Sequence, residues 1–146
     1  MIVEKVIIDA SNEKIKDTIT LTYHDRFIRR KKLISDNKVE FLVNLPETIS
    51  LKENSSFVLE NGSFILIKYA KEPLLEIASE NLMKIVWHIG NRHIPCQIEL
   101  DRLLIQEDKV IEELIIKLGG KIKKIHEEFC PEGGAYGLGR THGHKH

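Results

Sequence analysis

The 146-residue chain has no long hydrophobic run and little cysteine. No stretch approaches the roughly 18 consecutive apolar residues of a transmembrane helix, so no membrane span is expected. The first five residues do not follow the charged, apolar, small-residue order of a secretory signal peptide, which makes the cytoplasm the expected compartment. Cys96 and Cys130 are far from any CxxC spacing, so no zinc knuckle is expected. Each is predicted to be a buried thiol, with a soft metal ligand as the alternative.

A net charge of one sign is also missing. Lysine and arginine together number 22, and so do aspartate and glutamate. No global field therefore draws the chain to nucleic acid or to a membrane, and neither is expected as a partner. The basic run Arg29 to Lys32 has no base-stacking aromatic residues beside it and has acidic residues nearby. It is interpreted as a solvated strand face, with a protein-docking patch as the second interpretation.

Sequence signatures of catalysis and of nucleotide binding are absent as well. The chain has no Gly-rich phosphate-binding loop ending in Gly-Lys-Ser/Thr and no HExxH pair. It offers no Ser-His-Asp or Cys-His arrangement in a setting that supports catalysis. We therefore expect no enzyme, and any nucleotide hydrolysis must come from a partner.

The first half of the chain contains short runs rich in β-branched and aromatic residues, separated by turn signals. Asn61-Gly62 and Asp36-Asn37 mark two of the expected hairpins. Residues 1–72 are therefore predicted to form a small antiparallel β sandwich or barrel. The expected strands run over residues 3–8, 18–23, 27–30, 39–43, 57–59 and 64–69.

After Pro73 the sequence pattern changes from strands alone to alternating strands and helices. A strand is expected over residues 74–78, and then a helix that Ser79 caps and that Gly90 or Asn91 ends with a left-handed residue. One or two strands follow over 97–105, then a second helix capped by Asp108 and ended by Gly119-Gly120, and a strand over 121–127. This order predicts a ferredoxin-like βαββαβ domain over residues 73–130. The glycine-rich residues 131–146 are predicted to be a flexible arm, so the fold class is α+β.

Histidines are concentrated at the C-terminus. His142, His144 and His146 occupy alternate positions, so in an extended chain their imidazoles point to one side and can converge on one ion. A fourth candidate ligand, His93, stands in the segment Gly90-Asn91-Arg92-His93-Ile94-Pro95. Neutral imidazole suits nickel, copper, zinc or iron. The alternatives are a purification tag or an incidental tail, and for His93 a hydrogen bond to a loop carbonyl.

These segments together resemble one known family. The residues 88–95, HIGNRHIP, followed by 131–137, PEGGAYG, and by the terminal histidines, are similar to the UreE family of urease accessory proteins, which are nickel metallochaperones. In the first half, Leu21-Thr22, the basic run at 29–32, Asn44-Leu45-Pro46 and Asn61-Gly62 fit the same pattern in the same order. The GNRHxP segment is the most specific part of this resemblance.

The resemblance implies a homodimer that delivers Ni²⁺ to the urease apoprotein complex with a urease accessory GTPase. It implies an N-terminal β domain that binds a polypeptide and a ferredoxin-like domain that dimerises. In such proteins the histidine at the position of His93 meets its two-fold mate on one ion, and tail histidines add ligands, here His142, His144 and His146. Zinc or copper binding in vitro is an accompanying expectation. The alternative function is metal sequestration or sensing without a urease client.

Overall fold

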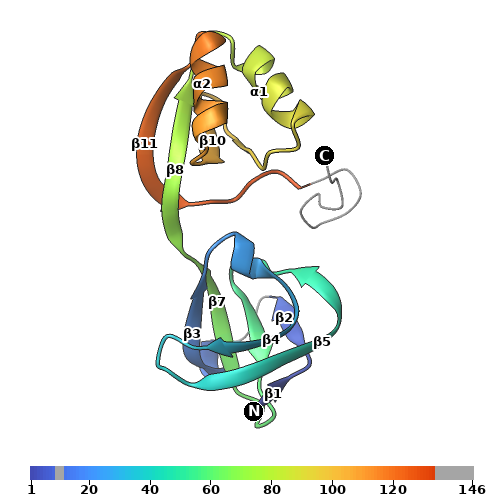
Figure 1. Cartoon of the computed structure of the whole chain (residues 1–146). Coiled ribbons are helices and arrows are strands. Elements are labelled where there is room, and N and C mark those ends of the chain that lie inside the picture. Colours follow the sequence, from blue (N-terminus) through green and yellow to red (C-terminus); the bar gives the residue numbers. More distant parts are fainter. Residues whose placement is uncertain (9–11, 134–146) are drawn as a thin grey trace. The chain divides into compact units, whose positions relative to one another are not determined.

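The computed structural model describes residues 1–8 and 12–133. The chain divides into two compact units, an N-terminal unit, Met1–Ala70, and a C-terminal unit, Lys71–His146. Within the described residues the fold is mixed α+β, with mostly strands and two α-helices (Figure 1). No described helix has both the length and the hydrophobicity needed to cross a lipid bilayer. The fold class predicted from the sequence is thus confirmed at the level of α+β.

The N-terminal unit consists of two small sheets. One has the strand order β1-β5-β4 and the other β2-β6-β7-β3. The single N-terminal strand predicted over residues 3–8 is two strands, which belong to different sheets. The strands of this unit are β1 (Ile2–Val3), β2 (Val6–Ile8), β3 (Ile15–Leu21), β4 (Phe27–Ile34), β5 (Glu40–Ser50), β6 (Ser55–Val58) and β7 (Phe64–Tyr69).

The expectation of a purely antiparallel unit is wrong. β1 pairs with β5 in parallel, and so does β3 with β7, whereas the other neighbouring pairs are antiparallel. Parallel neighbours need a crossover connection, because a short turn can join only antiparallel strands. Between β3 and β7 the chain passes through β4 and β5 in the other sheet and returns by β6. The strand pattern in the sequence does not reveal this crossover.

The two predicted turns of this unit are present, but the left-handed residues differ from the expectation. In the loop from β6 to β7 only Gly62 of the Asn61-Gly62 pair has positive φ, at 84°. In the loop from β4 to β5 the positive φ, 67°, belongs to Lys38, after the expected Asp36-Asn37. The core of the unit is a cluster of buried residues from both sheets: Val3, Ile19, Leu21, Ile28, Leu33, Phe41, Val43, Leu45, Leu51, Phe57, Leu59, Ile65 and Ile67.

The C-terminal unit follows the predicted element order β-α-β-β-α-β. Its sheet has the strand order β11-β8-β10-β9, and every neighbouring pair is antiparallel. Both helices lie on the same side of this sheet in Figure 1. The elements are β8 (Lys71–Ala78), α1 (Leu82–Asn91), β9 (Gln97–Ile98), β10 (Leu103–Gln106), α2 (Lys109–Lys117) and β11 (Lys121–Glu128).

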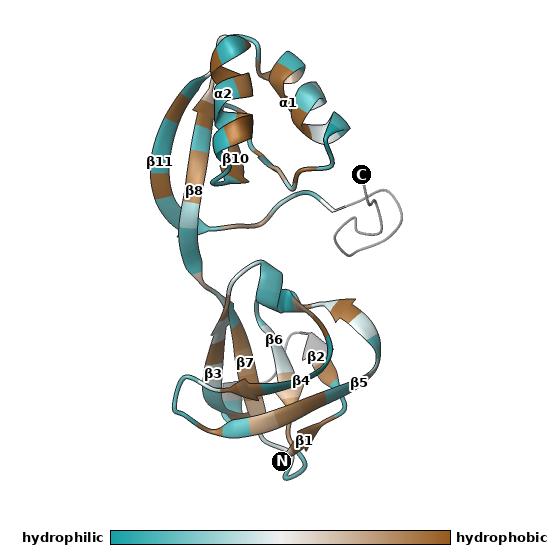
Figure 2. Cartoon of the chain, in the orientation of Figure 1, coloured by the Kyte–Doolittle hydropathy of each residue, from teal (hydrophilic) through white to brown (hydrophobic). Residues whose placement is uncertain are grey.

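The core of the C-terminal unit lies between the sheet and the helices. In Figure 2 β8 is hydrophilic at its start and mainly hydrophobic toward its end, whereas β11 alternates between hydrophobic and hydrophilic residues, as an outer strand does. Removing this apolar surface from water is the main force that holds the helices on the sheet. The buried cluster contains Leu75, Ile77, Ile85, Ile89, Cys96, Leu103, Ile105, Ile111 and Ile115.

The two helices begin differently. The Asp108 carboxylate accepts hydrogen bonds from the backbone N–H groups of Val110 and Ile111, at 3.0 and 3.1 Å, as the sequence predicts. The prediction that Ser79 caps α1 is wrong. The N-cap of α1 is Asn81, whose side chain makes no capping hydrogen bond, and the Ser79 hydroxyl accepts from the Asn81 N–H instead. A Ser side chain can close such a short local turn as easily as it caps a helix, so the sequence does not separate the two.

Candidate metal-binding site

His93 lies in the turn that ends α1. The N–H of His93 donates to the carbonyl of Gly90 at 3.0 Å, and the N–H of Ile94 donates to the carbonyl of Ile89 at 3.4 Å. These two hydrogen bonds form a Schellman motif, in which the residue after the C-cap adopts the left-handed conformation. That residue is His93, with φ 58°.

The sequence prediction assigned the left-handed stop to Gly90 or Asn91, and this is wrong. Both residues are part of α1, and the left-handed position falls on a histidine. A side chain there costs about 1–2 kcal/mol relative to a right-handed conformation, which is why glycine usually fills it. Conformational propensity alone therefore favours Gly90 as the left-handed residue. The hydrogen bonds of the helix end place the turn three residues later.

The end of α1 is tied down by its own side chains. Arg92 donates from Nη1 to the carbonyl of His88 at 3.1 Å. The ring of His88 packs edge-on against Trp87, with centroids 5.0 Å apart. The imidazole of His93 is thus carried by a fixed turn, at the helix end whose dipole favours a cation.

An exposed apolar stripe runs along α1 toward that turn. Met83 is 85% exposed and Trp87 is 63% exposed, and the two are one helical turn apart. Gly90 follows on the same stripe, and a Cβ there would contact nothing within 4 Å. The sequence contains a signal for this second face, because Met83 and Trp87 fall outside the spacing of the core-facing residues Leu82, Ile85 and Ile89.

The chain after β11 returns to the neighbourhood of His93. Phe129 is fully buried, and the N–H of Cys130 donates to Oε1 of Gln97 at 2.9 Å. The N–H of Glu132 donates to the carbonyl of Cys96 at 2.9 Å. Cys96 is only three residues beyond His93 in the sequence. The last described residues of the chain are therefore fixed close to the turn that carries the candidate ligand.

The candidate ligands are not assembled within the described part of the chain. No group of three or more histidine, cysteine, aspartate or glutamate side chains with the geometry of a metal site occurs in residues 1–8 and 12–133. His93 is exposed. His142, His144 and His146 lie outside the described residues, as does the predicted arm 131–146 from residue 134 onward. A site with three or more ligands at His93 therefore needs ligands from the tail, from a second copy of the chain or from solvent.

Comparison with known proteins bears on what this arrangement serves. Residues 72–146 match the model of the UreE urease accessory protein, C-terminal domain. The chain is 52% identical over 130 residues to the urease accessory protein UreE of Ruegeria pomeroyi, which covers 89% of this chain and 87% of that protein. It is 48% identical to the urease accessory protein UreE of Rhodobacter capsulatus, over 89% of this chain and 83% of that protein. The chain belongs to the UreE family of urease accessory proteins. Membership implies a role in urease maturation.

Among the candidate soft ligands of this UreE family member, the two cysteines differ. Cys96 is buried in the core of the C-terminal unit, and burial, with a smaller contribution from the nearby Glu132 carboxylate, raises the pKa of its thiol to about 12. It stays protonated at neutral pH, as expected of an inert thiol. The prediction that both thiols are buried is wrong for Cys130, which is exposed. Cys130 lies beyond the end of β11 and follows the buried Phe129.

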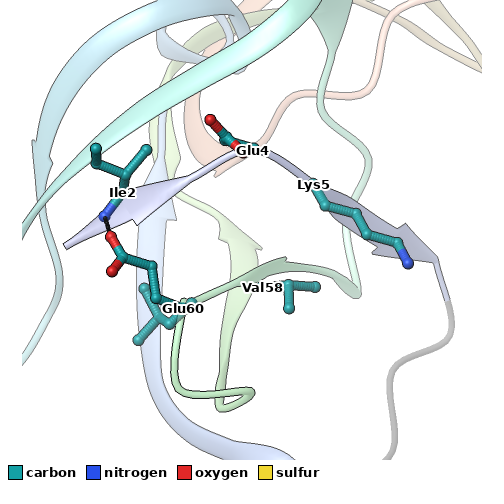
Figure 3. Close-up of a pocket in the computed structure, with 6 residues that line it drawn as sticks. Ile2, Glu4, Lys5, Val58 and Glu60 are labelled. Atoms are coloured by element: carbon teal, nitrogen blue, oxygen red, sulfur yellow. Dashed lines mark hydrogen bonds between the residues drawn. The ribbon is translucent and has the colours of Figure 1, made fainter.

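The N-terminal unit has a hollow of another kind. It encloses about 400 Å³ and is lined by Ile2, Glu4, Lys5, Val58, Leu59 and Glu60. Figure 3 shows the Glu60 carboxylate reaching the backbone of Ile2, where Oε1 accepts from the N–H at 2.6 Å. This lining contains no histidine or cysteine and mixes aliphatic with charged groups, which suits contact with a polypeptide better than with a transition metal.

Proposed function

We propose that the chain is a cytoplasmic, homodimeric nickel metallochaperone that delivers Ni²⁺ for assembly of the urease active site. Nickel is its cargo, held by His93 from each subunit and by the tail histidines His142, His144 and His146. The observation that carries the proposal is the exposed His93 in the left-handed position of a Schellman turn. Backbone strain retained where glycine would relieve it points to a function of the side chain.

A second copy of the chain supplies what one copy lacks. One imidazole on an exposed turn does not hold a divalent ion against water, because late transition metals take several nitrogen ligands. The stripe of Met83, Trp87 and Gly90 leads directly to His93 and is of the apolar kind that symmetric dimers bury. Pairing this stripe with itself brings two His93 rings toward one axis. The proposed ferredoxin-like unit is then both the dimerisation unit and the metal-binding unit.

The tail can reach the same ion. His142 lies nine residues beyond Gly133, which corresponds to a chain length of at most roughly 32 Å. Gly133 follows Glu132, which is hydrogen-bonded to Cys96, and Cys96 is at most roughly 11 Å along the chain from His93. The three terminal histidines are therefore within reach of either His93 of a dimer. Zinc and copper, which also favour imidazole, are expected to bind in vitro.

An exposed and shared site suits delivery. A recipient protein can replace the ligands one at a time, whereas a fully enclosed site would release its ion slowly. The recipients that we propose are the urease apoprotein complex and the urease accessory GTPase. The N-terminal unit, with its hollow and its mixed lining, is the proposed polypeptide-binding part.

Nickel transfer is the direct test. Nickel-loaded protein should activate apo-urease in the presence of the accessory GTPase and an excess of a small-molecule chelator that would trap free Ni²⁺. The His93→Gly variant keeps the turn and removes the imidazole, so its activation should fall to the level of free nickel under chelator. His126→Ala is the matched control, because His126 is exposed on β11 of the same unit. Equal activation by wild type and His93→Gly would refute the assignment of His93.

Metal sequestration or sensing without a urease client is the alternative function, because it would use the same histidines. The two functions differ in handover. A sequestering protein would bind nickel with the same dependence on His93 but would not activate apo-urease under chelator challenge. That result, with intact binding, would replace delivery by storage.

A further inference from the structure

The segment that leads to the C-terminal tail is held at four successive points. Glu127, at the end of β11, forms a bidentate ion pair with Arg102, with N–O distances of 3.0 and 3.1 Å. Phe129 is fully buried. The N–H groups of Cys130 and Glu132 then donate to Gln97 and to the carbonyl of Cys96, respectively. The chain is thereby directed from one edge of the sheet to the other, where β9 begins.

The Gln97 side chain connects this segment to a network of hydrogen bonds on the sheet. Its Oε1 accepts from the Cys130 N–H at 2.9 Å, and its Nε2 donates to Oε2 of Glu99 at 2.9 Å. The other oxygen of Glu99 accepts from Nε of Arg102 at 3.1 Å. Gln97 therefore acts as donor and acceptor at once, which an amide can do and a carboxylate cannot.

Arg102 fixes the far end of this chain of hydrogen bonds. It contacts Glu76 on β8, Glu99 and Glu127. Its hydrogen bonds, first to Glu127 and then to Glu99, raise the pKa of the guanidinium further above its already high value. The same contact lowers the pKa of the Glu127 carboxyl. The Gln97 amide is thus oriented by partners that are themselves held in place.

We propose that Gln97 is a positioning residue for metal capture: by holding the Cys130 backbone it fixes the start of the histidine tail beside the His93 turn. This inference rests on the proposed function, and it adds the element that makes tail and turn act as one site. A tail tethered close to His93 presents its imidazoles at a high effective concentration, which falls as the tether lengthens. Without the Gln97 contact, the segment loses one of its four holding points, and the tether to the tail starts from a less firmly fixed position beside His93.

A metal-free measurement tests the anchor by itself. In Gln97→Leu, which removes both hydrogen bonds of the amide, amide hydrogen exchange over residues 130–133 should speed up at least about 10-fold. Exchange in α1 and in β8 should stay the same. Gln106→Leu is the matched control, because the Gln106 amide donates to Glu72 on β8 of the same sheet and not to the tail segment. Unchanged exchange over 130–133 in Gln97→Leu would overturn the anchor whether or not nickel binds.

A double-mutant cycle tests the role in capture. Truncation after Gly139 removes the three tail histidines and should weaken nickel binding to the wild type by about 10-fold or more in calorimetry. In the Gln97→Leu background the same truncation should cost no more than about threefold, because the start of the tail is then less firmly fixed beside His93. In the Gln106→Leu background it should cost as much as in the wild type.

The outcomes separate the two proposals. Equal truncation effects in all three backgrounds would overturn the role of Gln97 while leaving nickel binding intact. No nickel binding by the wild type would overturn the proposed function, and the exchange experiment would still decide the anchor. Gln97→Asn, whose side chain is one methylene shorter and keeps its polarity, should reproduce the effects of Gln97→Leu, and it provides the result if the leucine variant does not fold.

Discussion

The two helices of the C-terminal unit end in the same hydrogen-bonded turn, but with different residues in the same place. At the end of α2 the left-handed position is Gly119, with φ 88°, and the N–H groups of Gly119 and Gly120 donate to Ile116 and Ile115. At the end of α1 the corresponding residue is His93, with φ 58°. Glycine adopts this conformation without strain and histidine does not.

The difference indicates what each turn is for. Helix α2 is built for stability, because Asp108 caps its first turn and a glycine follows its last turn. Helix α1 begins at an N-cap whose side chain makes no capping hydrogen bond. It ends at a strained histidine next to an exposed apolar stripe. A position that gives up stability and presents an exposed imidazole is the kind of exception expected at a functional site.

The largest expected effect comes from removing the imidazole. His93→Gly should weaken the tightest nickel-binding event by at least about 100-fold, because loss of a direct ligand exceeds the 10–100-fold cost of losing an outer-shell partner. Isothermal titration calorimetry near pH 7.5 measures it, with His126→Ala as the control. Wild-type binding should also weaken as the pH falls below about 6.5, because protons compete for imidazole nitrogen. A His93→Gly isotherm like that of the wild type would mean that the two helix ends differ for some other reason.

The residue after each left-handed position provides the second test. Ile94 packs against the core after α1, whereas a Cβ added to Gly120 would lie 2.5 Å from Cγ2 of Ile115 and 3.2 Å from Cδ1 of Ile85. Gly120→Ala should therefore destabilise the protein by about 1–3 kcal/mol, since the buried Ile115 has no room to move. Urea denaturation measures the loss. Nickel affinity should stay unchanged, and a parallel loss of nickel binding would contradict the division of roles between the two ends.

Opposite substitutions at the two left-handed positions should change the free energy of unfolding in opposite directions. Gly119→Ala meets no steric contact within 4 Å, so its cost is the backbone strain alone, about 1 kcal/mol. His93→Gly should raise the free energy of unfolding of the metal-free protein by about 0.5–1 kcal/mol. Both are read from urea denaturation at one protein concentration, because dimerisation would couple stability to concentration. A destabilised His93→Gly variant would show that His93 is a structural residue.

The N-cap of α2 should likewise contribute more to stability than the N-cap of α1. Asp108→Ala removes two capping hydrogen bonds and should cost about 1 kcal/mol. Asn81→Ala removes no side-chain cap, so its cost should be close to zero. Thermal and urea denaturation of the two variants in parallel give the comparison. Equal losses would mean that the Asn81 side chain stabilises α1 by another contact.

The smallest effect concerns Cys96, which follows the α1 turn. Its folded pKa of about 12 is above the ordinary value of 9.0, so the fold favours the protonated thiol. That stability is fully present below pH 9 and is lost progressively as the pH rises toward 12. At pH 9.5 the free energy of unfolding should be lower than at pH 8 by about 1 kcal/mol, and Cys96→Ala should not show this pH dependence.

In the native protein a thiol reagent should label the exposed Cys130 fast and Cys96 only after unfolding.

Much of the element order follows from local patterns in the sequence. The apolar spacing of α2, its Asp108 cap and its Gly119-Gly120 stop agree with one another, and this helix has the predicted start and stop. α1 carries conflicting local signals, because Ser79, Asn81, Gly90 and Asn91 all suit helix ends. Its boundaries were predicted wrongly at both ends for that reason. The parallel pairing of β3 with β7 depends on contacts between distant segments, which no local pattern contains.

The candidate site was predictable only in its chemistry. The histidines and the family resemblance indicate a late transition metal and name His93. They do not indicate that His93 is in a left-handed conformation, that Met83 and Trp87 form an exposed stripe, or that Gln97 contacts the backbone of Cys130. Each of these depends on which face of an element is buried and on which distant segment returns to it.

Local sequence patterns are enough to establish the α+β composition, the family and the residue types available for metal binding, because periodicity, capping chemistry and ligand chemistry are properties of neighbouring residues. Where those residues lie depends on tertiary packing. The core of the C-terminal unit can be buried on one side of α1 alone, so Met83 and Trp87 remain exposed. The same packing sets where α1 stops and where the chain after β11 returns, and this places the start of the histidine tail near His93.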